Sequence, residues 1–146
     1  MQSTPLYRTA KGEAYVGNSL ELLAELPDNC IDLVMTSPPF ALRRQKSYGN
    51  VEETEYVQWI KPFGQEVFRV LKESGSFVLE LGGAYRSGVP SRSLYNFRVL
   101  LAFCDEIGFQ LTEDSNRFRG CRSIVPDSVL TFSIKSSLSF IRFLRK

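Results

Sequence analysis

A hydroxyl side chain, two prolines and an aromatic ring follow one another in the segment Ser37-Pro38-Pro39-Phe40. The segment comes directly after an apolar stretch, residues 31–36, that has the composition of a short strand. Because proline has no N–H and a fixed φ, the strand cannot continue through the two prolines, and Pro38 biases Ser37 toward extended geometry. The sequence therefore predicts a stiff turn that holds a hydroxyl, backbone carbonyls and a ring in one arrangement.

Such a turn is suited to activating an exocyclic amine, whose lone pair is otherwise delocalised into the ring of its base. Acceptors on both N–H groups of the amine draw the nitrogen toward tetrahedral geometry, and the Ser37 hydroxyl and Pro38 carbonyl are two such acceptors, fixed before the reaction starts. Phe40 would stack on a base swung out of its duplex. Glu80, near the end of another predicted strand, could hydrogen-bond Ser37 and accept the released proton.

The segments around the turn alternate between strand and helix patterns. Strands are predicted over residues 13–17, 31–36, 76–82 and from 109, and helices over 20–26, 53–72 and 94–107, the last capped by Ser93. Asn18 and Glu21 have the form of a capping box, and Gly108 ends the last helix. This order predicts parallel βα units in a doubly wound α/β sheet, whose ligands bind at the carboxyl ends of strands.

The length and the amino-acid composition of the chain exclude several classes of function. The chain has 146 residues, of which 43% are hydrophobic, so we expect a single core. Histidine is absent, which excludes Ser-His-Asp hydrolysis and the usual zinc sites, and no metal is expected. The three cysteines lack Cys-x-x-Cys spacing and indicate reduced thiols in a cytoplasmic protein. With neither a signal peptide nor an apolar run of spanning length, no membrane partner is expected.

The turn and its flanking blocks resemble the cytosine-N4-specific DNA methyltransferases of restriction–modification systems, and in particular the PvuII-type subgroup. The blocks that carry the resemblance are Thr36-Ser-Pro-Pro-Phe40, Gly17-Asn-Ser-Leu-Glu-Leu-Leu23 and Gly75-Ser-Phe-Val-Leu-Glu-Leu-Gly-Gly-Ala-Tyr85. The likeness extends over about residues 7 to 114. It implies a Rossmann-like methyltransferase sheet and transfer of a methyl group from S-adenosyl-L-methionine to the N4 amino group of cytosine. The partner would be double-stranded DNA with a flipped cytosine.

The resemblance also implies residue roles. The residues expected to be catalytic are Ser37, Pro38, Pro39, Phe40 and Glu80. The family usually carries Asp at the position of Glu80, and the extra methylene of Glu weakens this assignment.

Cofactor contacts would come from Asn18, Thr36 and Ser37. Asn18 stands where the family has Asp, and its alternative role is that of a helix cap alone. The residues expected to contact DNA phosphates are Arg43, Arg44, Lys46 and Arg92. Their alternative is to be solvated loop charges.

The likeness ends at Asp114, which divides the chain into two parts. Residues 1–114 would be the catalytic-side portion of a methyltransferase domain, and residues 115–146 a divergent tail that is either frameshifted or poorly ordered. The glycine loop with which the family binds its cofactor does not occur in the sequence. We therefore expect an incomplete sheet, weak cofactor binding and little activity from this chain alone, and a second chain carrying the cofactor loop as a partner.

Three other functions stay open. Adenine-N6 methylation uses the same amine chemistry, although serine at position 37 favours cytosine-N4. Methylation of a protein glutamine would use Asn-Pro-Pro-Tyr. A non-catalytic DNA-binding or interaction fragment would need no cofactor loop. Carbon-5 methylation is disfavoured, because none of the cysteines follows a proline.

Overall fold

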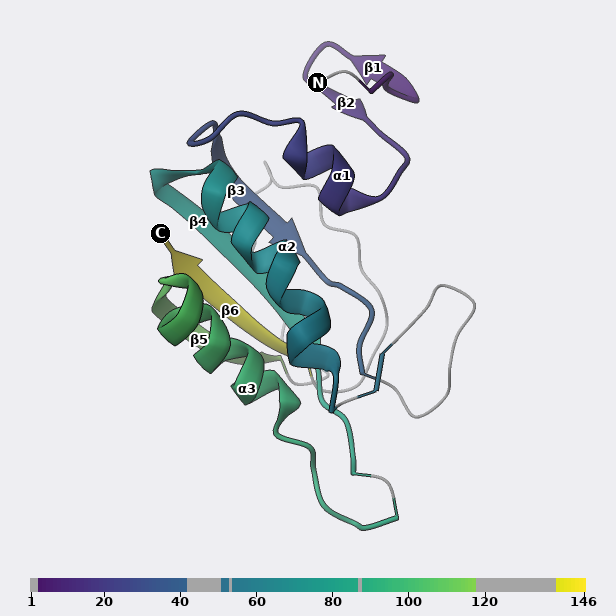
Figure 1. Cartoon of the computed structure of the whole chain (residues 1–146), viewed down its shortest axis with the longest axis vertical. Helices are drawn as coiled ribbons and strands as arrows, with labels where there is room; N and C mark the ends of the chain where they lie inside the picture. Colours follow the sequence, from purple (N-terminus) through teal and green to yellow (C-terminus); the bar gives the residue numbers. More distant parts are fainter. Residues whose placement is uncertain (1–2, 42–50, 53, 87, 118–138) are drawn as a thin grey trace.

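The computed structural model describes residues 3–41, 51–52, 54–86, 88–117 and 139–146 (Figure 1). Two short strands, β1 (Tyr7–Thr9) and β2 (Gly12–Ala14), form an antiparallel hairpin. The main sheet has the order β3-β4-β6-β5. Its members are β3 (Ile31–Thr36), β4 (Leu71–Gly82), β5 (Gln110–Arg117) and β6 (Ser139–Arg145).

The helices are α1 (Ser19–Ala24), α2 (Tyr56–Val70) and α3 (Tyr95–Leu101), which continues as a π-helix, η1 (Ala102–Ile107). Figure 1 shows α2 and α3 on the same face of the main sheet, with their first turns at the end where β4 finishes. In the described part of the chain, no helix is both long and apolar enough to cross a membrane.

The core lies between β4 and the two helices α2 and α3. Alternate residues of β4 are buried on this face: Phe77, Leu79 and Leu81. They pack against buried residues of the helices, namely Tyr56, Ile60, Val67, Tyr95, Val99 and Phe103. Residues at the intervening positions of β4, including Glu80 and Gly82, therefore face the other side of the sheet.

The sheet is mixed, which differs from the parallel arrangement that the sequence predicts. β3 and β4 are parallel, as expected, with Thr36 opposite Leu79. β6 pairs antiparallel with both β4 and β5. β4 and β5 run in the same direction, and β6 lies between them in the opposite direction. The sequence does not predict this pairing because the partners of β6 are distant along the chain.

Ser139–Arg145 of the predicted divergent tail form β6 of the sheet. Leu144 lies opposite Phe77 on one side and Leu111 on the other, and its side chain is fully buried. Residues 118–138 lie outside the described part, and the proposed division at residue 114 stays a prediction.

Helix α2 ends at Val70, and β4 begins at the next residue. The sequence predicts a helix to residue 72 that stops at Ser74-Gly75. The backbone of Leu71 is already extended, with φ −68° and ψ 138°, and its side chain is fully buried. Pairing of Leu71 with Ile31 in the sheet explains the early end, because that contact is tertiary and leaves no local signal.

The cap predicted for α1 is confirmed. The Asn18 side chain accepts a hydrogen bond of 3.1 Å from the Leu20 N–H. Its amide also donates to the Glu21 carboxylate at 3.2 Å, so Glu21 supports the cap through the Asn18 side chain.

Arg69 of α2 ties α1 and the connection between α1 and β3 to the core. Its guanidinium donates to the carbonyls of Leu23 and Leu26, both at 2.9 Å, and to the carboxylates of Glu66 and Asp28. Hydrogen bonds to Glu66 and then Asp28 raise the pKa of Arg69 above its usual value.

We expect Arg69→Ala to lower the free energy of unfolding by about 1–3 kcal/mol, because the two carbonyls and two carboxylates lose their shared donor. Arg69→Lys should recover only part of this loss, since an ammonium lacks the planar fork. Urea denaturation measures both variants, with Arg98→Ala on an exposed helix surface as the control. Equal stability of the Arg69 and Arg98 alanine variants would contradict the prediction.

Candidate active site

The Ser37–Phe40 turn lies at the carboxyl end of β3, as the sequence predicts, and all four residues are half-buried. In the parallel register, Thr36 is opposite Leu79. Ser37 is the first residue after β3, and Glu80 follows Leu79 within β4. The register thus sets the predicted carboxylate beside the turn that carries the predicted hydroxyl.

The Phe40 ring packs directly on Gly82, the last residue of β4. A Cβ built on Gly82 would lie 2.4 Å from Cδ2 of Phe40, a distance at which no side chain fits without moving the ring. Since Glu80 and Gly82 are two residues apart in a strand, they face the same side of the sheet. Phe40 and Glu80 are therefore on the face opposite α2 and α3.

Two buried tyrosines outside the predicted site residues, Tyr56 and Tyr95, hold the turn and the end of β4. The Tyr56 hydroxyl donates to the Pro39 carbonyl at 2.7 Å, and the Tyr95 hydroxyl donates to the Gly82 carbonyl. Tyr56 occupies an apolar position of its helix, where periodicity predicts only packing. A buried phenol hydroxyl needs a hydrogen-bond partner, and this requirement was the one signal that could have indicated a role beyond packing.

Burial, and secondly the neighbouring Tyr95, raise the pKa of Tyr56 well above the usual value for tyrosine. Tyr56 therefore stays protonated in the folded chain at a pH where it ionises in the unfolded chain, above about 10. Its contribution to stability is complete below that pH and is lost as the pH rises further.

We expect the free energy of unfolding to fall more steeply between pH 9.5 and about 11 for the wild-type chain than for Tyr56→Phe. The difference between the two chains isolates this tyrosine from the other titrating groups. Urea denaturation at several pH values measures it. Parallel pH profiles would show that Tyr56 ionises equally in the folded and unfolded states.

The predicted cofactor residues are only partly assembled. Thr36 is exposed at the end of β3, beside the turn, and Asn18 is exposed at the start of α1. Both hydrogen-bonding atoms of the Asn18 amide serve the cap.

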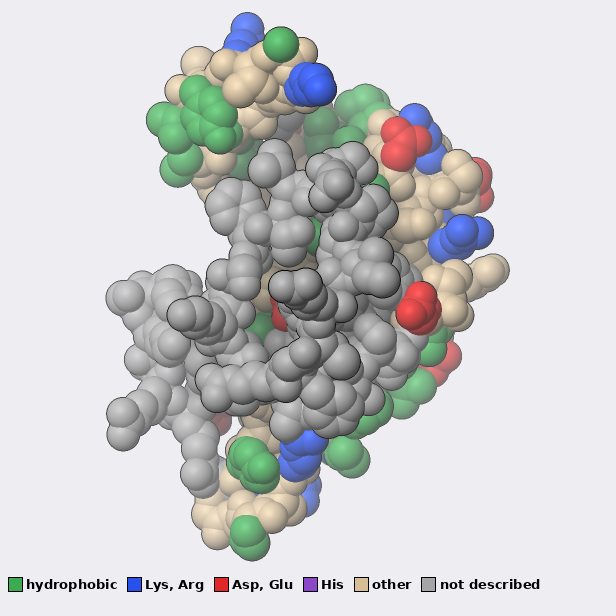
Figure 2. Space-filling view, turned by 180° about the vertical axis from the view of Figure 1, so that it is seen from behind, with side chains coloured by type: hydrophobic (Ala, Val, Ile, Leu, Met, Phe, Trp, Pro, Cys, Tyr) green, Lys and Arg blue, Asp and Glu red, His purple; other side chains and the backbone are tan. Residues whose placement is uncertain are grey.

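The predicted DNA contacts fall mostly outside the described residues. Arg43, Arg44 and Lys46 are in this group. Arg92 is exposed, with its guanidinium carbon 5.9 Å from the centroid of the Tyr85 ring. Figure 2 shows the Lys and Arg side chains of the described residues dispersed over the visible face. On this face, the described cations therefore do not gather into one patch that would indicate a DNA surface.

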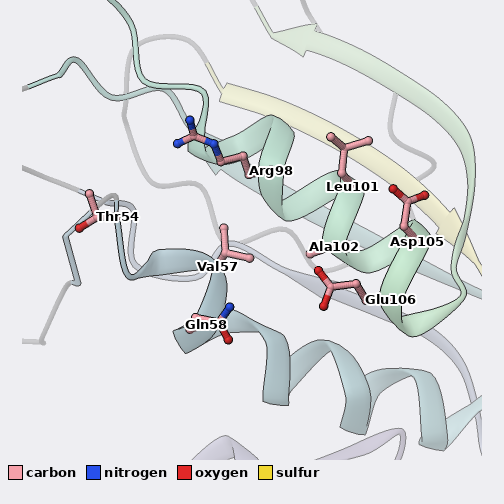
Figure 3. Close-up of a pocket in the computed structure, with 8 residues that line it drawn as sticks. All are labelled: Thr54, Val57, Gln58, Arg98, Leu101, Ala102, Asp105 and Glu106. Atoms are coloured by element: carbon pink, nitrogen blue, oxygen red, sulfur yellow. The ribbon is translucent and has the colours of Figure 1, made fainter.

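A shallow groove of about 480 Å³ lies between the start of α2 and the α3–η1 helix (Figure 3). Val57 and Gln58 line one side, and Arg98, Leu101 and Asp105 line the other. None of the predicted site residues lines it, so the groove is separate from the Ser37–Phe40 turn.

Comparison with known proteins gives one family match and several relatives. Residues 31–123, more than half of the chain, match the N6_N4_Mtase family model, described as DNA methylase. The chain is 58% identical over 110 residues to the type II methyltransferase M.PvuII of Proteus hauseri, covering 75% of this chain and 33% of the relative. It is 37% identical over 112 residues to M.SfiI of Streptomyces fimbriatus, covering 63% and 27%.

The fold is similar to that of solved methyltransferases. The structure of the cytosine-N4-specific PvuII DNA methyltransferase superposes with a TM-score of 0.78 and 45% identity, covering 99% of this chain and 52% of that one. A DNA modification methylase structure from Thermus thermophilus, complexed with S-adenosyl-L-methionine, has a TM-score of 0.63 at 22% identity, covering 90% and 54%, which shows a shared fold.

These matches confirm the predicted α/β methyltransferase fold. The chain spans about a third of the curated relative M.PvuII and about half of the solved PvuII chain. The turn at the end of β3 lies within the matched residues. This chain therefore belongs to the DNA methylase family of N6 and N4 methyltransferases.

Proposed function

We propose that this chain carries the catalytic turn of a DNA methyltransferase that transfers a methyl group to the N4 amino group of cytosine in a restriction–modification system. The cofactor would be S-adenosyl-L-methionine, the substrate double-stranded DNA, and the compartment the cytoplasm. The 58% identity to M.PvuII and the 45% identity to the solved cytosine-N4-specific enzyme favour this specificity within the family.

One structural observation carries the proposal. The parallel register sets Glu80 beside the turn that carries Ser37, and the Phe40 ring lies on the face that Glu80 shares. The carboxyl ends of parallel strands are where open α/β sheets bind ligands. This placement supports entry of a substrate base at this edge, beside a hydroxyl, a carboxylate and a ring.

The proposed roles follow from the chemistry of the amine. The Ser37 hydroxyl oxygen and the Pro38 carbonyl accept hydrogen bonds from the two N–H groups, which frees the nitrogen lone pair. Pro39 holds the turn rigid, and Phe40 stacks on a cytosine flipped out of the duplex. Glu80 hydrogen-bonds Ser37 and accepts the proton that the amine loses. The cofactor, when bound, supplies an electrophilic methyl group on a sulfonium.

The proposal also assigns residues that contact the cofactor and the DNA. Thr36 and Ser37 would contact the cofactor beside the turn, and Asn18 would have to exchange part of its cap for such a contact. The glycine loop would come from a second chain. Phosphate contacts would come from the four basic residues Arg43, Arg44, Lys46 and Arg92.

Calorimetric titration with S-adenosyl-L-methionine is the first test. We expect weak or undetectable binding by this chain alone. Micromolar binding that is lost in Asn18→Ala would show that the chain builds a cofactor site without a glycine loop, and would remove the need for a second chain.

The second test identifies the product. Residues 1–114 replace the matching segment of M.PvuII, and the chimera is incubated with DNA and labelled cofactor. We expect N4-methylcytosine on analysis of the nucleosides. N6-methyladenine would favour the adenine reaction, and DNA binding with no methylated base would favour a non-catalytic fragment.

A further inference from the structure

We propose that Tyr56 and Tyr95 are positioning residues that fix the Ser37–Phe40 turn in its active shape, an inference that rests on the proposed methyl transfer. We call the pair the tyrosine brace. It consists of two hydroxyl groups, each at the first residue of a helix, that reach the ends of two neighbouring strands.

The first half of the brace acts on the turn itself. Tyr56 is fully buried, and its hydroxyl donates to the Pro39 carbonyl at 2.7 Å. The prolines offer no N–H through which the turn could be held by a strand neighbour. The Tyr56 hydroxyl therefore holds the turn through the Pro39 carbonyl, the one backbone hydrogen-bonding group that a proline keeps. Because the Pro39 carbonyl already accepts this hydrogen bond, the Pro38 carbonyl is the better candidate to accept one from a substrate amine.

The second half acts on the strand that supports the ring. Tyr95 is fully buried, and its hydroxyl donates to the carbonyl of Gly82. Gly82 is the residue on which the Phe40 ring packs. Tyr95 therefore holds the surface against which the ring is pressed.

The two halves are joined. The Tyr56 and Tyr95 rings meet edge to face, with centroids 4.9 Å apart and planes at 71°. These contacts form a closed loop of interactions. The Tyr56 hydroxyl bonds the Pro39 carbonyl, and the Tyr56 ring packs on Tyr95. The Tyr95 hydroxyl bonds the Gly82 carbonyl, and Gly82 contacts Phe40, the residue after Pro39. Displacement of the turn would leave a buried hydroxyl without its acceptor, which is costly.

The test uses Tyr56→Phe and Tyr95→Phe, which keep the rings and remove only the hydroxyls, in the full chain. Tyr7→Phe, at a tyrosine that is 60% exposed, is the control. The measurement is the ¹³C shift of each acceptor carbonyl and the ¹⁵N shift of the amide that follows it. Thermal unfolding is recorded alongside.

For Tyr56→Phe we expect upfield shifts at the Pro39 carbonyl and the Phe40 amide. For Tyr95→Phe we expect the same at the Gly82 carbonyl and the Gly83 amide, with a secondary change at Phe40. Tyr7→Phe should leave these signals unchanged. If either core variant unfolds more readily while the Pro39 and Phe40 signals stay at their wild-type values, the tyrosines only fill the core, and the proposal is overturned.

Methyl transfer provides a second readout in the M.PvuII chimera described above. A misplaced turn should lower kcat about 10- to 100-fold and leave the KM values for DNA and cofactor nearly unchanged. An unchanged kcat in Tyr56→Phe would overturn the positioning role. Because the carbonyl and amide signals need no catalysis, an inactive wild-type chimera would count against the proposed function, and the brace would still be decided by those signals.

Discussion

Replacement of Ser37 by alanine is expected to lower the rate of methyl transfer about 100- to 1,000-fold, the size of effect seen when one preorganised hydrogen-bonding group is removed from a reacting centre. The change removes one of the two acceptors on the amine and leaves the Pro38 carbonyl. It also leaves Glu80 without its proposed partner. Phe40 keeps its contact with Gly82, so base binding should be little affected.

The measurement is single-turnover methyl transfer by the chimera of residues 1–114 with the rest of M.PvuII. The matched control is Ser74→Ala, at an exposed serine of β4. Both variants should unfold at the same temperature as the parent. A loss of less than about threefold in Ser37→Ala would mean that the hydroxyl is not an acceptor in the transition state.

Replacement of Leu144 by alanine is expected to lower the free energy of unfolding by about 2–5 kcal/mol, the usual cost of a cavity at a buried leucine. Leu144 is fully buried and lies between Phe77 of β4 and Leu111 of β5. The cavity would open in the middle of the sheet, where neighbouring strands cannot easily close around it.

This variant also decides the role of the tail. Arg145→Ala, at the next residue and with an exposed side chain, is the matched control and should change stability little. If β6 is part of the folded sheet, only the leucine variant unfolds at a lower urea concentration than the wild-type chain. If both variants are as stable as the wild-type chain, residues 139–146 do not contribute to the core, and the tail is a poorly ordered extension.

Local signals were sufficient for the turn and for the strand before it. The predicted strand, residues 31–36, matches β3. The match is close because two prolines stop a strand through their own covalent structure, whatever surrounds them. Asn18 is a similar case, since its cap forms with residues two and three positions away.

Tertiary contacts decided the elements whose partners are distant in sequence. Leu71 is extended because it pairs with Ile31, although the helical pattern continues past it. β6 lies between β4 and β5 because its residues find partners more than 20 positions away, and nothing local in a serine- and phenylalanine-rich stretch indicates that pairing.

The site shows the same division. The residue types and their order are local properties, and they were enough to select Ser37, Pro38 and Phe40 as groups that could do chemistry. The register that sets Glu80 beside the turn, and the bonds by which Tyr56 and Tyr95 hold it, came from tertiary packing. The physical reason is that strand register and buried hydrogen bonds depend on how distant segments pack.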